Sequence, residues 1–382
     1  KGEQFEPYHD IIRKGVDQVL EIMGEQVYIT SFDNLKLAGK YYHLTDGAPL
    51  IIFFHGYRCS SLRDGNGIFL YSRKKGYNVL MVDNRAHGLS EGKCITFGIK
   101  ERFDVLHWVN YAIERFGKEQ KILLAGLSMG AATVLMSADV ALPENVRGIM
   151  ADCPYSSPKE ILCTVMKQLK FPVKPTYWIA KFAAKYIGKF DLEETSAVEA
   201  VKNTKIPILI IHGDDDRFVP CSMSEECQKV QKEYVDLVLV KGAGHGMSHC
   251  VDGKTYESVS LTDTIYMAPY ITTGNKAENG KPTLTWDSMK DVKEYQVYRS
   301  NSANGKFVKV FTTPYRTYTH TSAEIDETYY YYVVAVYNDG DASFSSKVVK
   351  NIAVPSKPHV TAAINKDGMV DISWKDVEGA DK

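Results

Sequence analysis

The chain has 382 residues, 44% of them hydrophobic and 24% charged, which is enough material for one large core and one or more further modules. Its 46 Lys and Arg residues are balanced by 47 Asp and Glu residues, so no overall charge draws the chain to nucleic acid or to an anionic membrane. The choice of partner must therefore come from local sites.

Residues 8–23 predict an N-terminal helix, because apolar side chains recur there at close to helical spacing and Gly24 ends the run. Residues 26–30 and 35–42 then alternate apolar and polar side chains on either side of a turn. This alternation predicts an antiparallel hairpin at the start of the sheet.

Continuous apolar runs follow, and most of them lead into a helix, such as the one expected over residues 100–116. Strands that are apolar on both faces and separated by helices indicate a parallel sheet covered on both sides. We therefore expect an α/β fold with a mostly parallel, doubly wound sheet. The six runs are residues 49–54, 78–82, 122–125, 146–151, 206–211 and 235–240.

The segment 156–201 interrupts this succession of strands and helices. It contains helical pieces rich in Lys and aromatic residues, such as 177–186. It lies between the strand at 146–151, the sixth when the two hairpin strands are counted, and the strand at 206–211. This is the place for an inserted cap, or lid, over an active site. An amphipathic surface helix with solvated lysines is the plainer interpretation, and the two are compatible.

The sequence Gly-Leu-Ser-Met-Gly over residues 126–130 follows a buried strand and leads into an apolar helix. A Ser on such a sharp turn lies above the sheet edge, and the flanking glycines leave no Cβ to clash where strand and helix crowd together. The first amides of the helix point toward whatever the hydroxyl attacks. Ser128 is therefore the candidate nucleophile.

A nucleophilic Ser needs a base and an acid that orients the base. The loop 242–246, Gly-Ala-Gly-His-Gly, follows the last strand and offers His245 as the base. The acid is less distinct, because three consecutive Asp residues, 214–216, follow the strand before it.

Residues 26–250 resemble the α/β-hydrolase superfamily, in which the nucleophile, the acid and the His follow one another in this order. The loop 212–220 is similar to the family's H-G-x-x-D-x-x-V-P pattern, which implies Asp216 as the catalytic acid and His245 as the base. Asp152 is the alternative acid, because some members of the superfamily use the loop after the sixth strand.

Two further segments carry the resemblance. Phe-Phe-His-Gly-Tyr at 53–57 matches the family's strand followed by His-Gly-x, which implies that the backbone N–H groups of Tyr57 and Met129 form an oxyanion hole. Residues 83–90 resemble the family's D-x-R-G-H-G-x-S segment, with Ala86 where Gly is usual, and we interpret them as structural.

The composition changes after the hydrolase-like part, for which we expect the bounds 1–270. Residues 271–354 hold short alternating runs rich in Tyr, Thr and Val, which indicate a small antiparallel sandwich. This part resembles a fibronectin type III domain with Trp286 in its core. The side chains expected to face inward are Tyr329, Tyr331, Val333 and Ala335.

Residues 355–382 resemble the start of a second such module, because Ile-Ser-Trp at 372–374 repeats Leu-Thr-Trp at 284–286. A partial sandwich cannot bury its faces. We therefore expect the chain from about residue 356 to be poorly ordered or to borrow contacts from the neighbouring module.

The resemblance implies a serine hydrolase that cleaves carboxylic esters of small acylated molecules through an acyl-enzyme, with no metal or cofactor, and a β-module that contacts a polymer or a cell surface. Two alternatives stay open. An aminopeptidase or amidase of the same superfamily would hold the substrate amine with a cap pocket or with the acidic residues of 191–194. A binding or adhesion protein would use the β-modules and keep the hydrolase domain as a scaffold.

The sequence also bears on the cellular compartment of the protein. The seven cysteines are odd in number and form no Cys-x-x-Cys pair, which favours free thiols over disulfides or a zinc site. No apolar run is as long as a membrane span, and because the chain opens on Lys1 rather than Met we expect an N-terminal piece to have been removed, with room in it for a signal or an anchor. Free thiols favour a reducing interior, but we give more weight to the fibronectin-like modules, which favour the cell surface or the exterior.

Overall fold

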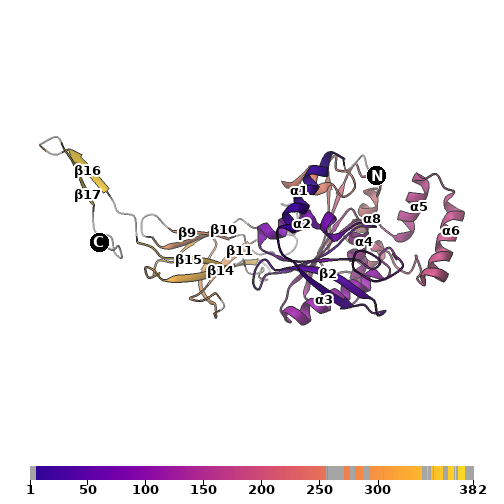
Figure 1. Cartoon of the computed structure of the whole chain (residues 1–382), viewed down its shortest axis with the longest axis horizontal. Coiled ribbons are helices and arrows are strands. Elements are labelled where there is room, and N and C mark those ends of the chain that lie inside the picture. Colours follow the sequence, from indigo (N-terminus) through magenta and orange to yellow (C-terminus); the bar gives the residue numbers. More distant parts are fainter. Residues whose placement is uncertain are drawn as a thin grey trace. The chain divides into compact units, whose positions relative to one another are not determined.

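The computed structural model describes residues 6–254, 256, 271–275, 280–286, 289, 292–303, 305–337, 342, 346, 348–355, 360–364, 366 and 369–374. The chain forms two compact units, Lys1–Ile265 and Tyr266–Lys382 (Figure 1). The domain border predicted after residue 270 adjoins residues 257–270, which lie outside the described residues.

An eight-stranded sheet forms the centre of the first unit, with the order β1-β2-β4-β3-β5-β6-β7-β8 (Figure 1). The first two strands pair antiparallel, β2 is antiparallel to β4, and the other neighbouring strands are parallel. The predicted hairpin and parallel sheet are thus confirmed. The strands are β1 (Glu25–Thr30), β2 (Lys36–Tyr42), β3 (Leu50–Phe54), β4 (Asn78–Val82), β5 (Ile122–Leu127), β6 (Val146–Asp152), β7 (Ile208–Gly213) and β8 (Val235–Val240).

The strand order reverses between β3 and β5, because β4 lies on one side of β3 and β5 on the other. In open α/β sheets, ligands bind outside the carboxyl ends of the strands at such a switch point. Every residue of β3 and β4 is buried, as the continuous apolar runs predict. The turn after β5 is therefore the place to look for a site.

Helices cover both faces of the sheet. All eight residues of α4 are buried, because this helix packs against the sheet and is covered by α3 and α7. The helices are η1 (Glu6–Tyr8), α1 (His9–Leu20), α2 (Ser61–Lys75), α3 (Glu101–Phe116), α4 (Met129–Met136), η2 (Ser137–Asp139), α5 (Pro158–Gln168), α6 (Val173–Ala183), η3 (Ala184–Gly188), α7 (Ala197–Val201), α8 (Ser222–Val230) and α9 (Ser248–Val251). Within the described residues, every helix is too short or too polar to cross a bilayer.

The cap consists of α5, α6 and η3, and it is shorter than the predicted segment 156–201. Ala197 and Val201 of α7 are buried in the main hydrophobic core, so α7 covers the sheet and is not part of the cap. The sequence suggested otherwise because α7 is one short helix directly after the Lys-rich pieces. The end of α5 is tied to the loop after β7 by Gln168 Nε2, which donates to the carbonyl oxygens of Arg217 and Phe218 at 2.9 and 3.3 Å.

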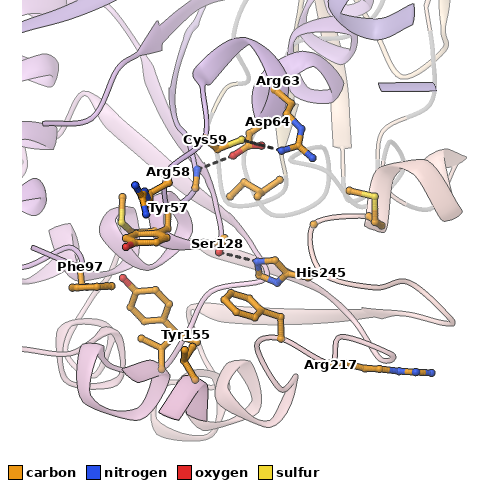
Figure 2. A pocket seen from close by; sticks show the side chains of 18 of the residues that line it. Tyr57, Arg58, Cys59, Arg63, Asp64, Phe97, Ser128, Tyr155, Arg217 and His245 are labelled. Atoms are coloured by element: carbon orange, nitrogen blue, oxygen red, sulfur yellow. Dashed lines mark hydrogen bonds between the residues drawn. The ribbon is translucent and has the colours of Figure 1, made fainter. Parts of the chain in front are cut away.

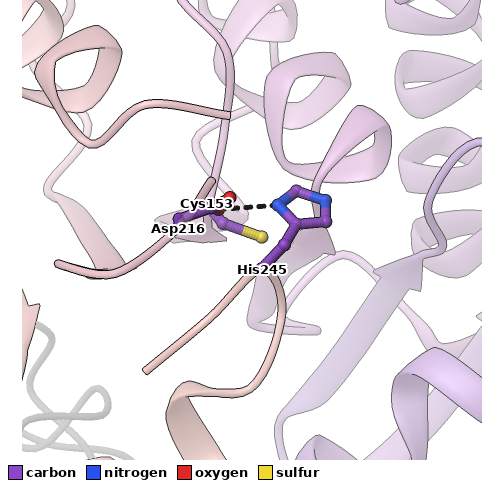
Figure 3. Close-up of side chains that lie close together, drawn as sticks. All are labelled: Cys153, Asp216 and His245. Carbon is purple, nitrogen blue, oxygen red and sulfur yellow. Dashed lines mark hydrogen bonds and ion pairs between the residues drawn. The ribbon is translucent and has the colours of Figure 1, made fainter. Parts of the chain in front are cut away.

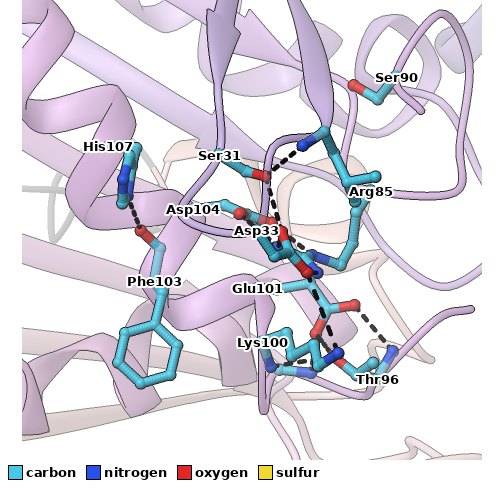
Figure 4. Close-up of polar contacts among 12 residues, drawn as sticks. Ser31, Asp33, Arg85, Ser90, Thr96, Lys100, Glu101, Phe103, Asp104 and His107 are labelled. Carbon is cyan, nitrogen blue, oxygen red and sulfur yellow. Dashed lines mark hydrogen bonds and ion pairs between the residues drawn. The ribbon is translucent and has the colours of Figure 1, made fainter. Parts of the chain in front are cut away.

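A buried ion-pair network fixes the segment after β4 (Figure 4). The Arg85 guanidinium donates to both oxygens of Asp104 in α3 at 2.7 Å, and also to Asp33 in the β1–β2 turn at 2.9 and 3.1 Å. Such paired bonds from one guanidinium add geometric specificity to charge attraction. The network therefore holds the hairpin, the loop after β4 and the start of α3 together.

In the second unit, two antiparallel sheets share one hydrophobic core. The sheets have the orders β13-β10-β9 and β12-β11-β14-β15. Trp286 and the four side chains predicted to face inward are all buried in this core, which confirms that part of the prediction. The strands are β9 (Ile271–Asn275), β10 (Pro282–Trp286), β11 (Val292–Ser300), β12 (Val308–Thr313), β13 (Thr317–Thr319), β14 (Thr328–Tyr337) and β15 (Val349–Ile352).

The last described segment is a separate hairpin. β16 (Val360–Ile364) pairs antiparallel with β17 (Val370–Trp374). These strands therefore pair with each other, whereas one of our two expectations was that they would borrow contacts from the neighbouring module. Backbone hydrogen bonding within the hairpin is local and needs no second sheet. Ile364 and Ile372 are nonetheless mostly exposed, as expected for a module without its other strands.

Ala86 provides a test of backbone strain. It has a φ of 61°, a left-handed conformation that costs an L-residue about 1–2 kcal/mol and a glycine almost nothing. We expect Ala86→Gly to stabilise the first unit by about 0.5–1 kcal/mol, since the greater freedom of Gly in the unfolded chain offsets part of the gain. Urea unfolding measures the change.

The matched variant Ala86→Val should destabilise the same transition, because a β-branched residue is still less compatible with positive φ. A lower midpoint for Ala86→Gly than for the wild type would contradict this account of the loop.

Candidate active site

Ser128 occupies the turn between β5 and α4 in a strained conformation, with φ 55° and ψ −112°. The turn is possible because both neighbouring glycines lack a Cβ. A Cβ on Gly126 would lie 2.4 Å from the backbone of Gly130, and one on Gly130 would lie 2.0 Å from the carbonyl oxygen of Phe54. The two glycines of the motif are therefore required by packing.

Ser128 is hydrogen-bonded to His245, which is hydrogen-bonded to Asp216. Ser128 Oγ lies 2.9 Å from His245 Nε2 (Figure 2), and His245 Nδ1 lies 2.7 Å from Asp216 Oδ2 (Figure 3). The three residues come from the turn after β5, the loop after β8 and the loop after β7. The structure thus brings together the three side chains that the sequence singled out.

The Asp216 carboxylate is buried but has several donors. Its Oδ1 accepts hydrogen bonds from the amides of Phe218 and Val219, both at 2.9 Å. Burial by itself raises the pKa of Asp216, but the hydrogen bonds from His212 and His245 outweigh it and hold the pKa well below its usual range. The carboxylate therefore stays ionised beside His245.

His212 also contacts the Asp216 carboxylate, and the sequence did not single it out as a site residue. Its Nε2 lies 3.1 Å from Asp216 Oδ2, and its Nδ1 lies 2.7 Å from Ser224 Oγ in α8. The His212 ring is fully buried at the end of β7. Its only signal in the sequence is its place as the first residue of the loop pattern that contains Asp216.

The loop after β3 runs beside the Ser128 turn. A Cβ on Gly56 would lie 3.5 Å from Ser128 Cβ, and the Gly56 amide donates to Asp64 at 2.8 Å. Met129 is the first residue of α4, so its N–H has no acceptor within the helix. The amides of Tyr57 and Met129 therefore belong to two backbone segments that lie side by side near Ser128.

His55 has the contacts of a residue that orients a loop. Its Nδ1 donates to the carbonyl oxygen of Gly56 at 2.8 Å, and its Nε2 accepts from the Asn84 amide at 3.1 Å. Burial lowers the pKa of His55 to about 4. The ring is neutral at physiological pH and connects the loops after β3 and β4.

A pocket of about 1010 Å³ opens above Ser128 and is lined by the loop after β3, by α5 of the cap and by the loop after β7 (Figure 2). Apolar side chains form much of its wall, among them Phe97, Tyr155, Ile161, Leu162, Val165 and Phe218. Most ligand pockets are apolar with a few placed polar groups. In this pocket, the hydrogen-bonded pair Ser128 and His245 is such a placed polar group.

The acidic residues of 191–194 do not line this pocket. Glu193 forms ion pairs with Lys159 and Lys181, and Glu194 Oε1 lies 2.8 Å from Arg102 Nη2. These carboxylates link the cap to the body of the first unit, so they do not offer an anchor for a substrate amine.

Cys153, Asp216 and His245 lie close together, with possible ligand atoms within 4.8 Å of one another (Figure 3). Burial raises the pKa of the Cys153 thiol well above its usual value. His245 uses both ring nitrogens in the hydrogen bonds to Ser128 and Asp216, and the cluster therefore fits a proton-transfer site better than a metal site.

Asp152, the alternative acid, ends β6 and is fully buried behind the turn. Its carbonyl oxygen accepts from the Ser128 amide at 2.8 Å, and its Oδ1 accepts from Ser248 Oγ at 3.4 Å. Burial raises the pKa of Asp152 to about 6. His245 is hydrogen-bonded to Asp216 rather than to Asp152.

The raised pKa of Asp152 predicts a pH-dependent stability. Below pH 4 the carboxyl is protonated in both the folded and the unfolded chain, and it has no ionic effect. Between pH 4 and pH 6 it ionises in the unfolded chain only, so the wild type loses stability as pH rises. A shift from 3.8 to about 6 corresponds to about 3 kcal/mol.

We therefore expect Asp152→Asn to gain about 3 kcal/mol relative to the wild type between pH 4 and pH 7. Urea unfolding of both proteins at several pH values measures this difference. A free-energy difference that does not change with pH would contradict the burial of an ionisable carboxyl here.

Comparisons with known proteins agree with this architecture. Residues 49–174 match the family model described as alpha/beta hydrolase fold. The uncharacterised protein YqkD of Bacillus subtilis is 29% identical over 255 residues, which cover 65% of this chain and 83% of YqkD. The bifunctional esterase/perhydrolase DCH of Acinetobacter calcoaceticus is 25% identical over 264 residues, which cover 58% of this chain and 93% of that protein.

Among solved structures, an esterase of Pyrococcus furiosus superposes with a TM-score of 0.52 and 26% sequence identity, over 63% of this chain and 90% of that chain. The share of this chain that superposes, 63%, is about the length of the first unit, Lys1–Ile265. The first unit has the α/β-hydrolase fold, and esterases of that fold are among its homologues.

Proposed function

We propose that the first unit is a serine hydrolase in which Ser128 is the nucleophile, His245 the general base and acid, and Asp216 the residue that orients His245. The observation that carries this proposal is the continuous hydrogen-bond chain from Ser128 Oγ through His245 to Asp216, at the floor of the pocket. The ionised Asp216 keeps the proton on His245 Nδ1, so that Nε2 is free to accept the Ser128 proton.

In this mechanism Ser128 Oγ attacks the carbonyl carbon of the substrate while His245 Nε2 takes the hydroxyl proton. The amides of Tyr57 and Met129 stabilise the oxyanion, each contributing about 3 kcal/mol to the transition state. His245 then gives its proton to the leaving group, and an acyl group remains on Ser128. Water, deprotonated by His245, attacks this acyl group and regenerates the Ser128 hydroxyl.

Carboxylic esters are the substrate class that the structure and the homologues favour. Two of the similar proteins are described as esterases. The pocket wall is largely apolar, which suits an acyl chain. An amine anchor at 191–194 loses support, because the carboxylates of Glu193 and Glu194 are held in ion pairs away from the pocket. The carboxylate that lines the pocket is that of Asp64, which accepts hydrogen bonds from the Gly56 amide and Cys59 Sγ.

We infer that the second unit is fibronectin III-like. Sheets of three and four antiparallel strands over one core, with Trp286 and Tyr295 packed together at 5.5 Å, support this assignment. Such a module would act as a spacer or as a contact to a polymer or surface, on the outside of the cell. In the adhesion alternative, this unit would bind the partner and Ser128 would have no catalytic role.

A fluorophosphonate probe tests the nucleophile. We expect the probe to label the wild type and not Ser128→Ala, and we expect this variant to lose about 10⁴–10⁶-fold in kcat. Ser137→Ala is the matched control, because Ser137 is a buried serine at the far end of the same helix and does not line the pocket. An unlabelled wild type, or equal labelling of Ser128→Ala, would remove the enzyme proposal and favour the adhesion alternative.

A substrate panel tests the ester preference. We expect kcat/KM for short- and medium-chain p-nitrophenyl esters to exceed that for aminoacyl p-nitroanilides, because no carboxylate among the described residues 191–194 reaches the pocket to hold a substrate amine. Hydroxycinnamate esters complete the panel. Faster turnover of the amides than of the esters would assign the site to the peptidase alternative.

A further inference from the structure

The cap carries a local charge that the whole chain lacks. Residues 161–190, which make up most of the cap, contain six lysines and no acidic residue, whereas Glu160 of α5 directly precedes them and the chain as a whole has a net charge of −1. The six are Lys167, Lys170, Lys174, Lys181, Lys185 and Lys189. The cap is thus a cationic segment on a neutral protein.

The same segment exposes large apolar side chains. We define the cap face as Phe171, Trp178, Ile179, Phe182, Tyr186 and Ile187, whose exposed fractions range from 51% for Phe182 to 80% for Ile187. Figure 1 shows α6 as the outer of the two cap helices, with α5 between it and the rest of the first unit. No residue of α6 is buried. Contiguous exposed apolar side chains of this kind mark an interaction surface.

The cap face is an ordered stripe. The ring centroids of Trp178 and Phe182 lie 5.9 Å apart, and those of Phe182 and Tyr186 lie 4.4 Å apart. Residues four apart lie on one side of a helix, so the three rings follow one another along α6 and η3. The opposite side of the same segment is anchored to the body, since Tyr177 and Ala184 pack with Ile99.

The lysines border this stripe. At about 100° per residue, Lys174 and Lys181 lie along the edge of α6 next to Trp178. Lys181 pairs with Glu193, whereas the exposed Lys174 and Lys185 have no carboxylate partner among the described residues. Two cations beside the aromatic stripe are therefore available to an external anion.

We propose that the cap face docks on the surface of an anionic lipid bilayer. A helical segment that lies in a membrane interface places aromatic and aliphatic side chains at the boundary of the headgroups and acyl chains, and lysines against the anionic headgroups. Trp and Tyr rings favour this boundary because they combine an apolar body with a polar tip. The ring stripe of Trp178, Phe182 and Tyr186 and the neighbouring Lys174 provide these groups on one side of α6 and η3, and Ile179 and Ile187 are exposed farther round the same segment.

Two other occupants fit less well. A second copy of the chain would bring two lysine-bordered faces together at a two-fold axis, which places like charges opposite each other. A soluble polyanion would account for the lysines, but it would leave Ile179 and Ile187 exposed to water. A lipid surface satisfies both the charges and the aliphatic side chains.

The cap face and the pocket are joined by the connection between α5 and α6. Leu169 lines the pocket and is 61% exposed, and it lies two residues from Phe171 of the cap face. The proposal concerns binding alone and does not depend on the role of Ser128.

Co-sedimentation of the full chain with phosphatidylcholine vesicles, with and without phosphatidylglycerol, tests the proposal. We expect binding to the anionic vesicles that weakens with salt. Lys174→Gln/Lys185→Gln should lower the partition coefficient about fivefold for each lysine, or about 25-fold in all. Trp178→Ser/Phe182→Ser should abolish binding. Thermal melting checks that each variant is folded.

Matched controls lie elsewhere on the first unit. Lys229→Gln/Lys232→Gln removes two exposed charges near α8, and Met23→Ser removes an almost fully exposed apolar side chain, so both should bind like the wild type. If the aromatic variant does not fold, the lysine variant and the salt dependence still decide the question.

Three results would overturn the proposal. They are no binding of the wild type to anionic vesicles, equal binding to vesicles of phosphatidylcholine alone, and binding that the cap variants do not reduce. A fourth overturning result would come from sedimentation velocity. A dimer that Trp178→Ser/Phe182→Ser converts to a monomer would assign the cap face to contact with a second copy of the chain.

Discussion

The close approach of α4 to the end of β3 determines the geometry of the site. Gly130 has no Cβ because one would lie 2.0 Å from the carbonyl oxygen of Phe54 and 2.8 Å from that of His55. This contact brings the residue before Gly130, Met129, close to the loop that contains Tyr57. The position of the Ser128 turn relative to the loop after β3 thus depends on one backbone contact. A side chain at Gly130 would push these two segments apart.

A second constraint acts on His245 through Asp216. Asp216 is bound by two backbone amides and by two imidazoles, and His212 is in turn held by Ser224 of α8. Each acceptor position on this buried carboxylate is thereby used, which is the condition for burying a charge without a large penalty. The orientation of His245 therefore rests on α8 and on the loop after β7 as much as on its own loop.

The sequence was sufficient for the sheet and for the centre of the site because both depend on local patterns. Continuous apolar runs identify buried parallel strands, and the glycines around Ser128 record a backbone contact that no other residue allows. His212 was missed because its role arises from a hydrogen bond to a residue four positions away and another to α8, neither of which leaves a pattern. The burial of α7 in the core could not be foreseen, because this helix has too few residues for its burial to be read from periodicity. The cap face could not be recognised because the same aromatic residues would look alike in a core and on a surface; only the exposed fractions distinguish them.

Five residues with positive φ that are not glycine surround the pocket or its neighbouring loops: Arg58, Ala86, Phe97, Ser128 and Cys153. Each such backbone conformation costs about 1–3 kcal/mol and persists only where the surrounding structure imposes it. The free energy stored there is comparable to the net stability of an ordinary domain, about 5–15 kcal/mol. Stabilising changes at positions far from these turns would therefore raise the stability of the first unit and leave the strained conformations unchanged.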